Sequence, residues 1–112
     1  MQKDTSLEVF ENKTTVRLES FSTVNSKCKI EDVLSSKGRV LILKLLAERD
    51  ELNISAIARI TNLNHRTTAK HLEFLTKAGL VQEKRFGRIK IFRYRLENSK
   101  AHSLKRLFEI WD

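Results

Sequence analysis

The chain has 112 residues, with 22 lysines and arginines against 14 aspartates and glutamates, no proline and one cysteine, Cys28. This length accommodates one domain, and a lone cysteine excludes both an intrachain disulfide and a cysteine-based metal site. No apolar run approaches the roughly 18 residues that indicate a membrane span, and residues 1–10 lack the apolar centre of a signal peptide. We therefore expect a cytoplasmic protein with no membrane partner.

The net charge of +8 is concentrated in the later part of the chain. Residues 1–36 carry five basic and six acidic side chains, whereas residues 37–112 carry 17 basic and 8 acidic ones. Between Arg59 and Arg95, ten basic residues stand against two acids. Such a local excess of positive charge is typical of a surface that binds phosphate, although it also fits an ordinary basic soluble protein.

Residues 1–29 are rich in threonine, serine and asparagine and contain only scattered apolar side chains. Because this segment can bury little apolar surface against the entropy of ordering its backbone, we predict a flexible polar N-terminal arm. The stretch "TTVRLES" alternates apolar and polar residues and so also fits a short strand. The folded domain is expected to occupy residues 30–112.

Two helices are predicted at the start of this domain. The stretch "IEDVLSS" indicates a short helix, and "KGRVLILKLLAE" carries apolar side chains around almost all of its circumference. A helix with this pattern belongs at the centre of a small core. Ser36 precedes the second helix and is its predicted N-cap.

A short strand and a third helix are predicted next. Leu52 and Ile54 alternate with polar neighbours, as in a strand. Ser55 is the predicted cap of a helix with apolar residues at helical spacing, which ends at the turn "TNLN". These apolar residues are Ala56, Ile57 and Ile60.

The fourth helix runs from His65 to about Ala78, with Asn64 as its predicted N-cap and Gly79 as the residue that closes it. At 100° per residue it has a seam that faces the core and an opposite face of long, mainly cationic side chains. The seam consists of Thr68, Leu72 and Leu75, and the opposite face of Arg66, Lys70, Glu73 and Lys77.

The stretch "LVQEKRFGRIKIFRYRL" predicts a β-hairpin that turns around Gly87, a residue free to take a positive φ. On the return strand, Phe92, Tyr94 and Leu96 share one face and are predicted to point inwards. Six cations within twelve residues exceed what solubility requires, so they favour phosphate binding. They are Lys84, Arg85, Arg88, Lys90, Arg93 and Arg95. The last two also fit the screening of an edge strand.

A last helix, capped by Asn98 or Ser99, is predicted over the stretch "KAHSLKRLFEIWD". Its apolar stripe either completes the core or packs against a second copy of the chain in a homodimer. The residues of this stripe are Ala101, Leu104, Leu107, Phe108 and Trp111.

A mainly α domain of three core helices with an attached hairpin is a winged helix-turn-helix. The stretches "LSSKGRVLILKLL" and "SAIARITNLNHRTTAKHLEFLTKAGLVQEKRFGRIKIFRYRL", over about residues 33–96, resemble the winged helix-turn-helix regulators of the ArsR/MarR type in bacteria and archaea. The small size and polar arm are also similar to the winged-helix proteins of crenarchaeal spindle-shaped viruses. That second resemblance implies an archaeal or viral source and, for a virus, the host cell cytoplasm.

The first resemblance implies specific roles for two segments. Residues 65–77 would be a recognition helix in the major groove of double-stranded DNA, and residues 84–90 a wing on the backbone or in the minor groove. The positions where the family contacts bases and nearby phosphates are His65, Arg66, Thr67 and Lys70, with Arg88 at the wing position. The charge density of the hairpin adds Lys84, Arg85 and Lys90 to these candidate DNA-binding residues.

Neither metal binding nor catalysis is expected. His65 and His71 lie six residues apart, whereas two ligands on one helix face are spaced by three or four. No nucleophile with a neighbouring base and no pair of carboxylates is evident, so we expect no enzyme and no cofactor. Metal-sensing members of the resembled family carry cysteines or clustered acids and histidines that this chain lacks, so a sensor function does not follow. His71 is expected to form hydrogen bonds at the edge of the core.

The function predicted from the sequence is that of a sequence-specific double-stranded DNA-binding protein that regulates transcription. The alternatives are a winged-helix module that binds another protein, since a fold does not fix a function, and a non-specific nucleic-acid binder. A homodimer would form through the last helix, with contacts from Leu104, Leu107, Phe108 and Trp111.

Overall fold

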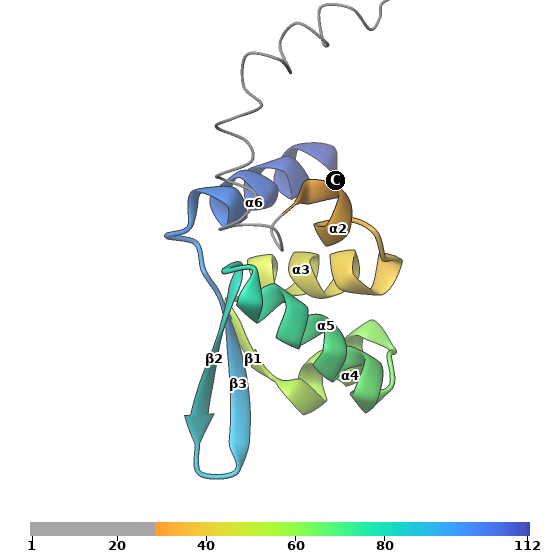
Figure 1. The fold of residues 1–112 in the computed structure, drawn as a ribbon, viewed down its shortest axis with the longest axis vertical. Helices are drawn as coiled ribbons and strands as arrows, with labels where there is room; N and C mark the ends of the chain where they lie inside the picture. The colour runs from red at the N-terminus through yellow and green to blue at the C-terminus, as the bar shows by residue number, and fades with distance from the viewer. Residues whose placement is uncertain (1–28) are drawn as a thin grey trace, which may run out of the picture.

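A computed structural model describes residues 29–112, and the predicted N-terminal arm lies almost entirely outside them. Three helices form the core, a three-stranded antiparallel sheet of order β1-β3-β2 lies at one side, and a last helix packs across the opposite end (Figure 1). The elements are α2 (Ile30–Val33), α3 (Lys37–Arg49), β1 (Glu51–Asn53), α4 (Ile54–Thr61), α5 (His65–Lys77), β2 (Val81–Phe86), β3 (Ile89–Tyr94) and α6 (Ser99–Trp111). This is the predicted winged helix-turn-helix.

Polar side chains at the predicted positions begin most of the helices. The Oγ atom of Ser36 accepts a hydrogen bond from Arg39 N (3.3 Å), and Asn64 Oδ1 accepts one from Thr67 N (2.8 Å). Of the two candidate caps for α6, Asn98 is the one used, since its Oδ1 accepts from Lys100 N at 2.8 Å. These bonds satisfy backbone donors that a helix start leaves without partners.

The predicted cap of α4 is wrong. Asn53, rather than Ser55, caps this helix, because its Oδ1 accepts from Ala56 N at 2.8 Å. Asn53 is also the last residue of β1 and has extended backbone angles (φ −80°, ψ 162°), so the strand passes into the helix with no linker. Ile54, predicted to be in the strand, therefore belongs to the helix.

The core lies between α3, α5 and the inner face of the sheet. Ile42, Leu43 and Leu46 of α3 have no exposed surface, and the predicted seam of α5 is buried as expected. Among the residues predicted to point inwards from β3, Phe92 and Tyr94 are buried, but Leu96 is 40% exposed. The chain turns after Tyr94, where Leu96 N donates to Tyr94 O, so the alternation of faces does not continue to residue 96.

Tyr94 connects the sheet to α6. Its hydroxyl donates a hydrogen bond of 2.6 Å to Ala101 O in α6, and its backbone N donates to Asp50 O at 2.9 Å. Only 2% of the residue is exposed, and this burial raises the pKa of the Tyr94 hydroxyl to about 12. The neutral hydroxyl thus holds the base of the hairpin against the last helix.

Because Tyr94 is the only tyrosine in the chain, its ionisation can be followed by absorbance near 295 nm. We predict a midpoint near pH 12, against 10 for a free tyrosine. The stability that this shift provides is complete below pH 10 and is lost as the pH rises towards 12, because the unfolded chain loses the proton first. A midpoint near 10 in the folded protein would contradict the buried hydrogen bond, and the chain in denaturant is the control.

Candidate nucleic-acid interface

The turn between α4 and α5 is fixed by backbone bonds. Asn62 adopts the left-handed conformation (φ 61°) and ends α4, and Leu63 N donates to Ala58 O at 3.0 Å. Asn64 then caps α5. A tight three-residue turn followed at once by a capped helix sets α5 at a defined angle to α4, which is the helix-turn-helix geometry.

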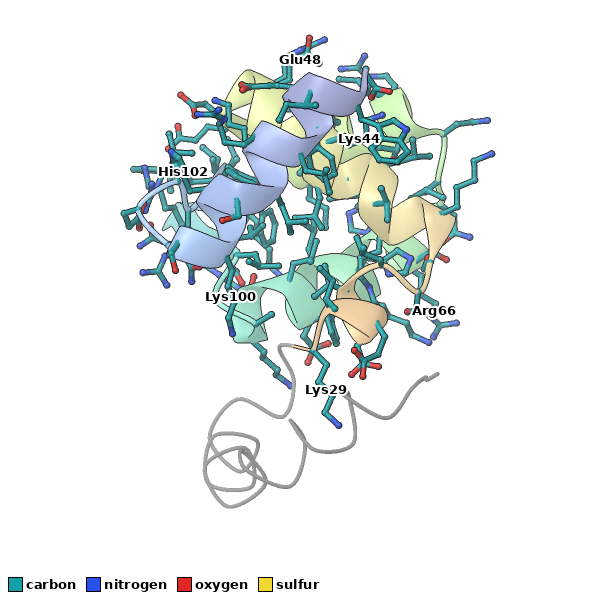
Figure 2. All side chains as sticks on the ribbon, turned by 90° about the horizontal axis from the view of Figure 1, so that it is seen from above. Lys29, Lys44, Glu48, Arg66, Lys100 and His102 are labelled. Atoms are coloured by element: carbon teal, nitrogen blue, oxygen red, sulfur yellow. The ribbon has the colours of Figure 1, made fainter. Side chains whose placement is uncertain are left out.

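One face of α5 is buried and the other is exposed, as the sequence predicted. Thr68, Leu72 and Leu75 have no exposed surface, and the Thr68 hydroxyl donates to Asn64 O at 2.9 Å, which satisfies it inside the core. The exposed face carries Arg66, Lys70, Glu73 and Lys77. The side chain of Arg66 projects from the edge of the molecule in Figure 2.

The charges on this exposed face divide along the helix. Lys77 forms an ion pair with Glu73 (3.2 Å), so the second half of α5 is close to neutral. In the first half, neither Arg66 nor Lys70 forms an ion pair with any residue of the described part of the chain. His65 is exposed beside them, and Thr67 is half-buried. Uncompensated positive charge is therefore concentrated at the beginning of the helix.

The hairpin turns through two residues, Gly87 and Arg88, with Gly87 at φ +65° as predicted. Arg85 pairs with Lys90 across the two strands. Both lie on the face of the sheet that also carries Phe92, which is closer to the core. Arg88 and Lys90 are exposed and have no ion pair within residues 29–112. They place two uncompensated cations at the end of the hairpin.

The other hairpin cations have acidic partners. Lys84 lies on the opposite face from Arg85 and pairs with Glu51 of β1, while Arg85 Nε is 3.3 Å from Glu83 Oε2. Exposed pairs of this kind contribute little stability, so both cations can exchange their partner for another anion. The structure thus separates the four predicted hairpin residues into two with and two without an ion pair.

Arg93 and Arg95 have structural partners. The guanidinium of Arg93 donates to Gln82 Oε1 (2.8 Å) and to both carboxylate oxygens of Glu97, and Arg95 Nε donates to Glu97 Oε2 (3.0 Å). The hydrogen bond from Arg93, then a backbone hydrogen bond at Glu97 itself and then the bond from Arg95 lower the pKa of Glu97 to about 2. The suggestion that the two arginines screen an edge strand is wrong, because Arg93 lies in β3, the central strand between β1 and β2, and Arg95 follows the end of that strand.

Sequence reasoning placed His71 at the edge of the core but missed its partner, Arg39 of α3. Arg39 Nε donates to His71 Nδ1 (3.3 Å), and the guanidinium lies 3.9 Å from the centre of the Phe74 ring. His71 Nε2 is 3.4 Å from Ser36 Oγ. Since an arginine can only donate, Nδ1 is the unprotonated nitrogen and Nε2 carries the proton. This network attaches α5 to the beginning of α3.

Burial, and then the neighbouring charge of Arg39, lower the pKa of His71 below 6.5. The folded protein therefore keeps His71 neutral where the unfolded chain would already bind a proton. The stability from this contact is present above about pH 6.5 and is lost as the pH falls through the lower pKa of the folded state.

We predict that an NMR titration of the folded protein gives His71 a midpoint below 6.5. The melting temperature of the unmodified protein should also fall more between pH 7.5 and pH 5 than that of His71→Asn. This variant is the control because it keeps an acceptor for Arg39 but cannot be protonated in this range. A His71 midpoint at or above 6.5 would contradict the proposed tautomer and its contact with Arg39.

Two other properties of the described residues concern ligands and membranes. Residues 29–112 contain no group of three or more histidine, cysteine, aspartate or glutamate side chains arranged to hold a metal ion. In the same part of the chain, no helix has the length and apolar character that crossing a membrane requires.

Comparison with known proteins identifies the family. Residues 36–83 match the model of the arsR family of bacterial regulatory proteins. The cadmium resistance transcriptional regulatory protein CadC of Listeria innocua is 35% identical over 75 residues, which are 67% of this chain and 61% of that protein. The chain thus spans about three fifths of the length of the curated relatives it matches.

Solved structures give the same result. A possible transcriptional regulatory protein (fragment 1–100) from Mycobacterium bovis is 31% identical, with a TM-score of 0.59 over 70% of this chain and 81% of that one. The solution structure of a homodimeric winged helix-turn-helix domain from Mycobacterium bovis, from a possible ArsR-family regulator, is 25% identical, with a TM-score of 0.61 over 98% and 86%. The resemblance to viral winged-helix proteins stays a prediction. The chain carries a helix-turn-helix domain of the ArsR family of bacterial regulatory proteins.

Proposed function

We propose that this protein regulates transcription by binding a specific sequence of double-stranded DNA. In this proposal, residues 65–77 read bases in the major groove and residues 84–90 contact the backbone or the minor groove. One observation carries the proposal. The cations of α5 and of the hairpin that have no ion pair within the described residues belong to the two elements that a winged helix-turn-helix directs at DNA.

The chemistry of the exposed face of α5 supports base reading. An arginine such as Arg66 can donate two hydrogen bonds to the O6 and N7 atoms of guanine, and Lys70, one helical turn later, reaches a neighbouring base or phosphate. His65 and Thr67 add a donor and a methyl group at the same end of the helix. A correct base contact of this kind contributes about 1–3 kcal/mol of discrimination.

The cations of the hairpin would supply affinity rather than specificity. Among residues 29–112, Arg88 and Lys90 have no acidic partner to displace, whereas Lys84 and Arg85 would exchange Glu51 and Glu83 for phosphates. Each neutralised phosphate releases counterions and makes the affinity more sensitive to salt. The four side chains therefore predict strong binding at low salt that weakens steeply as salt is added.

We further propose a homodimer that forms through α6. The Mycobacterium bovis relative with the solution structure is homodimeric, and α6 of this chain leaves Leu107 42% and Trp111 80% exposed. Leu107 also borders an apolar groove of about 380 Å³ between α2 and α6. Leu104 is buried and Phe108 packs against the core, so the intermolecular contact would use mainly Leu107 and Trp111.

A dimer would place two α5 helices on two half-sites about one helical turn apart. Because such a regulator acts by binding DNA, we propose no catalytic activity and a cytoplasmic location. A winged-helix module that binds only another protein is less well supported, because it would not need the uncompensated cations at the start of α5.

Selection of duplexes from a random pool, followed by binding at several salt concentrations, tests the DNA proposal. Arg66→Ala combined with Lys70→Ala should lower the affinity for the selected duplex at least tenfold, because base contacts are lost. The affinity for random duplex should fall much less. A protein that binds duplexes without enriching any sequence would instead be a non-specific binder.

The control for this experiment removes the same charge elsewhere. Arg49 and Arg106 are exposed and have no ion pair among residues 29–112, and they belong to α3 and α6, outside the proposed recognition helix and wing. Arg49→Ala with Arg106→Ala should leave specific affinity nearly unchanged. If this control weakens specific binding as much as the α5 variant, the assigned face is wrong.

The only tryptophan of the chain reports on the dimer. On association, the fluorescence of Trp111 should shift to the blue as the indole leaves water, and sedimentation should give twice the monomer mass. Leu107→Ala with Trp111→Ala should return the protein to the monomer, whereas Arg106→Ala, which removes no apolar side chain from α6, should not. A dimer that persists in the double variant would place the interface elsewhere.

A further inference from the structure

An apolar pair lies at the end of the hairpin and has no role in the core. Phe86 is 60% exposed and Ile89 is 53% exposed, and they face each other across the two strands, directly before and after the turn. The buried residues of the sheet lie on its other face, under the helices. Neither side chain is among those that pack against the core.

The position of the pair sets it apart from ordinary scattered surface residues. Figure 1 shows the end of the hairpin extending beyond the helices. Exposed apolar side chains on a protruding hairpin favour aggregation, and proteins commonly place charged residues at such ends. Here the two positions beside the turn are instead an aromatic ring and a branched aliphatic chain. Two adjacent apolar groups at a projecting end suggest a surface that meets a partner.

The charges around the pair restrict the chemistry of that partner. Arg88 lies within the turn, and Arg85 and Lys90 form the next pair along the strands. Of these three, only Arg85 has an ion pair within residues 29–112. The partner must therefore offer anionic groups around an apolar or stacked centre. Duplex DNA has this arrangement, since phosphates line both sides of a groove whose floor is formed by bases and sugars.

We propose that Phe86, supported by Ile89, is an apolar wedge that enters the minor groove and bends the DNA. The minor groove is about 6 Å wide, which admits a side chain from the end of the hairpin but not the two-stranded ribbon. Apolar side chains inserted at a base step partly unstack it and bend the duplex. Arg88 and Lys90 would then contact the phosphates beside the step.

This inference rests on the proposed DNA binding and adds a mechanism to it. Charged hairpin residues alone would contact phosphates without deforming the duplex. An inserted ring would make recognition depend on how easily the sequence under the hairpin bends, including base pairs that no side chain reads directly. Flexible pyrimidine–purine steps would be preferred at that position.

The experiment uses the full chain and a 40-bp duplex that carries the selected sequence, with a fluorescent donor and acceptor at its two ends. Binding is measured by anisotropy and bending by energy transfer between the ends. The unmodified protein should increase the transfer. Phe86→Ala should abolish this increase and weaken binding roughly tenfold, with an unchanged dependence on salt.

Two other variants separate the wedge from the charges. Phe86→Leu should retain most of the bending, because leucine also acts as a wedge. Arg88→Ala with Lys90→Ala should keep the bending but reduce the slope of log affinity against log salt by about 1.8 for each bound subunit, which corresponds to two phosphates per subunit. Since Phe86 is exposed, Phe86→Ala should unfold at the same temperature as the unmodified protein.

Three outcomes would overturn the proposal. If Phe86→Ala binds and bends the selected duplex like the unmodified protein, the wedge is wrong while the DNA-binding function stands. If the unmodified protein binds no duplex at all, both fail. If Phe86→Ala changes only binding to vesicles of phosphatidylglycerol and phosphatidylcholine, the apolar pair belongs to a membrane contact.

Discussion

The burial of one face of α5 against α3 determines where the other side chains of that helix point. Thr68, Leu72 and Leu75 have no exposed surface, and the contact of His71 with Arg39 holds the edge of the same face. Rotation of the helix by even a third of a turn would bring a charged side chain into the core, at a cost of several kcal/mol. The cations at the start of α5 are therefore directed outwards by the packing behind them.

The same constraint extends to the hairpin. The base of the β2–β3 ribbon is fixed by Val81, Phe92 and Tyr94, which are buried, and by the bond from Tyr94 to α6. Towards its end the ribbon leaves the helices, and its side chains become exposed. The rigid base fixes the distance between the exposed end of the hairpin and α5. Two elements that bind the same duplex require such a fixed distance.

Much of this architecture could be predicted because its signals are local. Ser36 and Asn64 begin helices, Gly79 and Gly87 take a positive φ where the chain turns, and the spacing of apolar residues identified the buried face of α5. The prediction was wrong where two elements meet without a linker, as at Asn53. It was also wrong at Leu96, where a turn ends the strand.

Contacts between distant residues could not be predicted. Arg39 and His71 are 32 residues apart, and Lys84 and Glu51 are 33 apart, so neither pair leaves a pattern in the sequence. The pairing of β1 with β3 also joins residues that are far apart in the sequence, and it makes β3 a central strand. For the interface, the sequence located the cations, whereas only the structure separates those that have acidic partners from those that do not.

The central claim is that the start of α5 and the end of the hairpin form one DNA-binding surface. The most direct test is to titrate the isotope-labelled protein with the selected duplex and to follow each backbone amide by NMR. We expect the largest shifts at residues 65–70 and 84–90, all saturating at the same ratio of DNA to protein, with little change around Arg106. Shifts confined to α6, or the two segments responding at different ratios, would contradict the account.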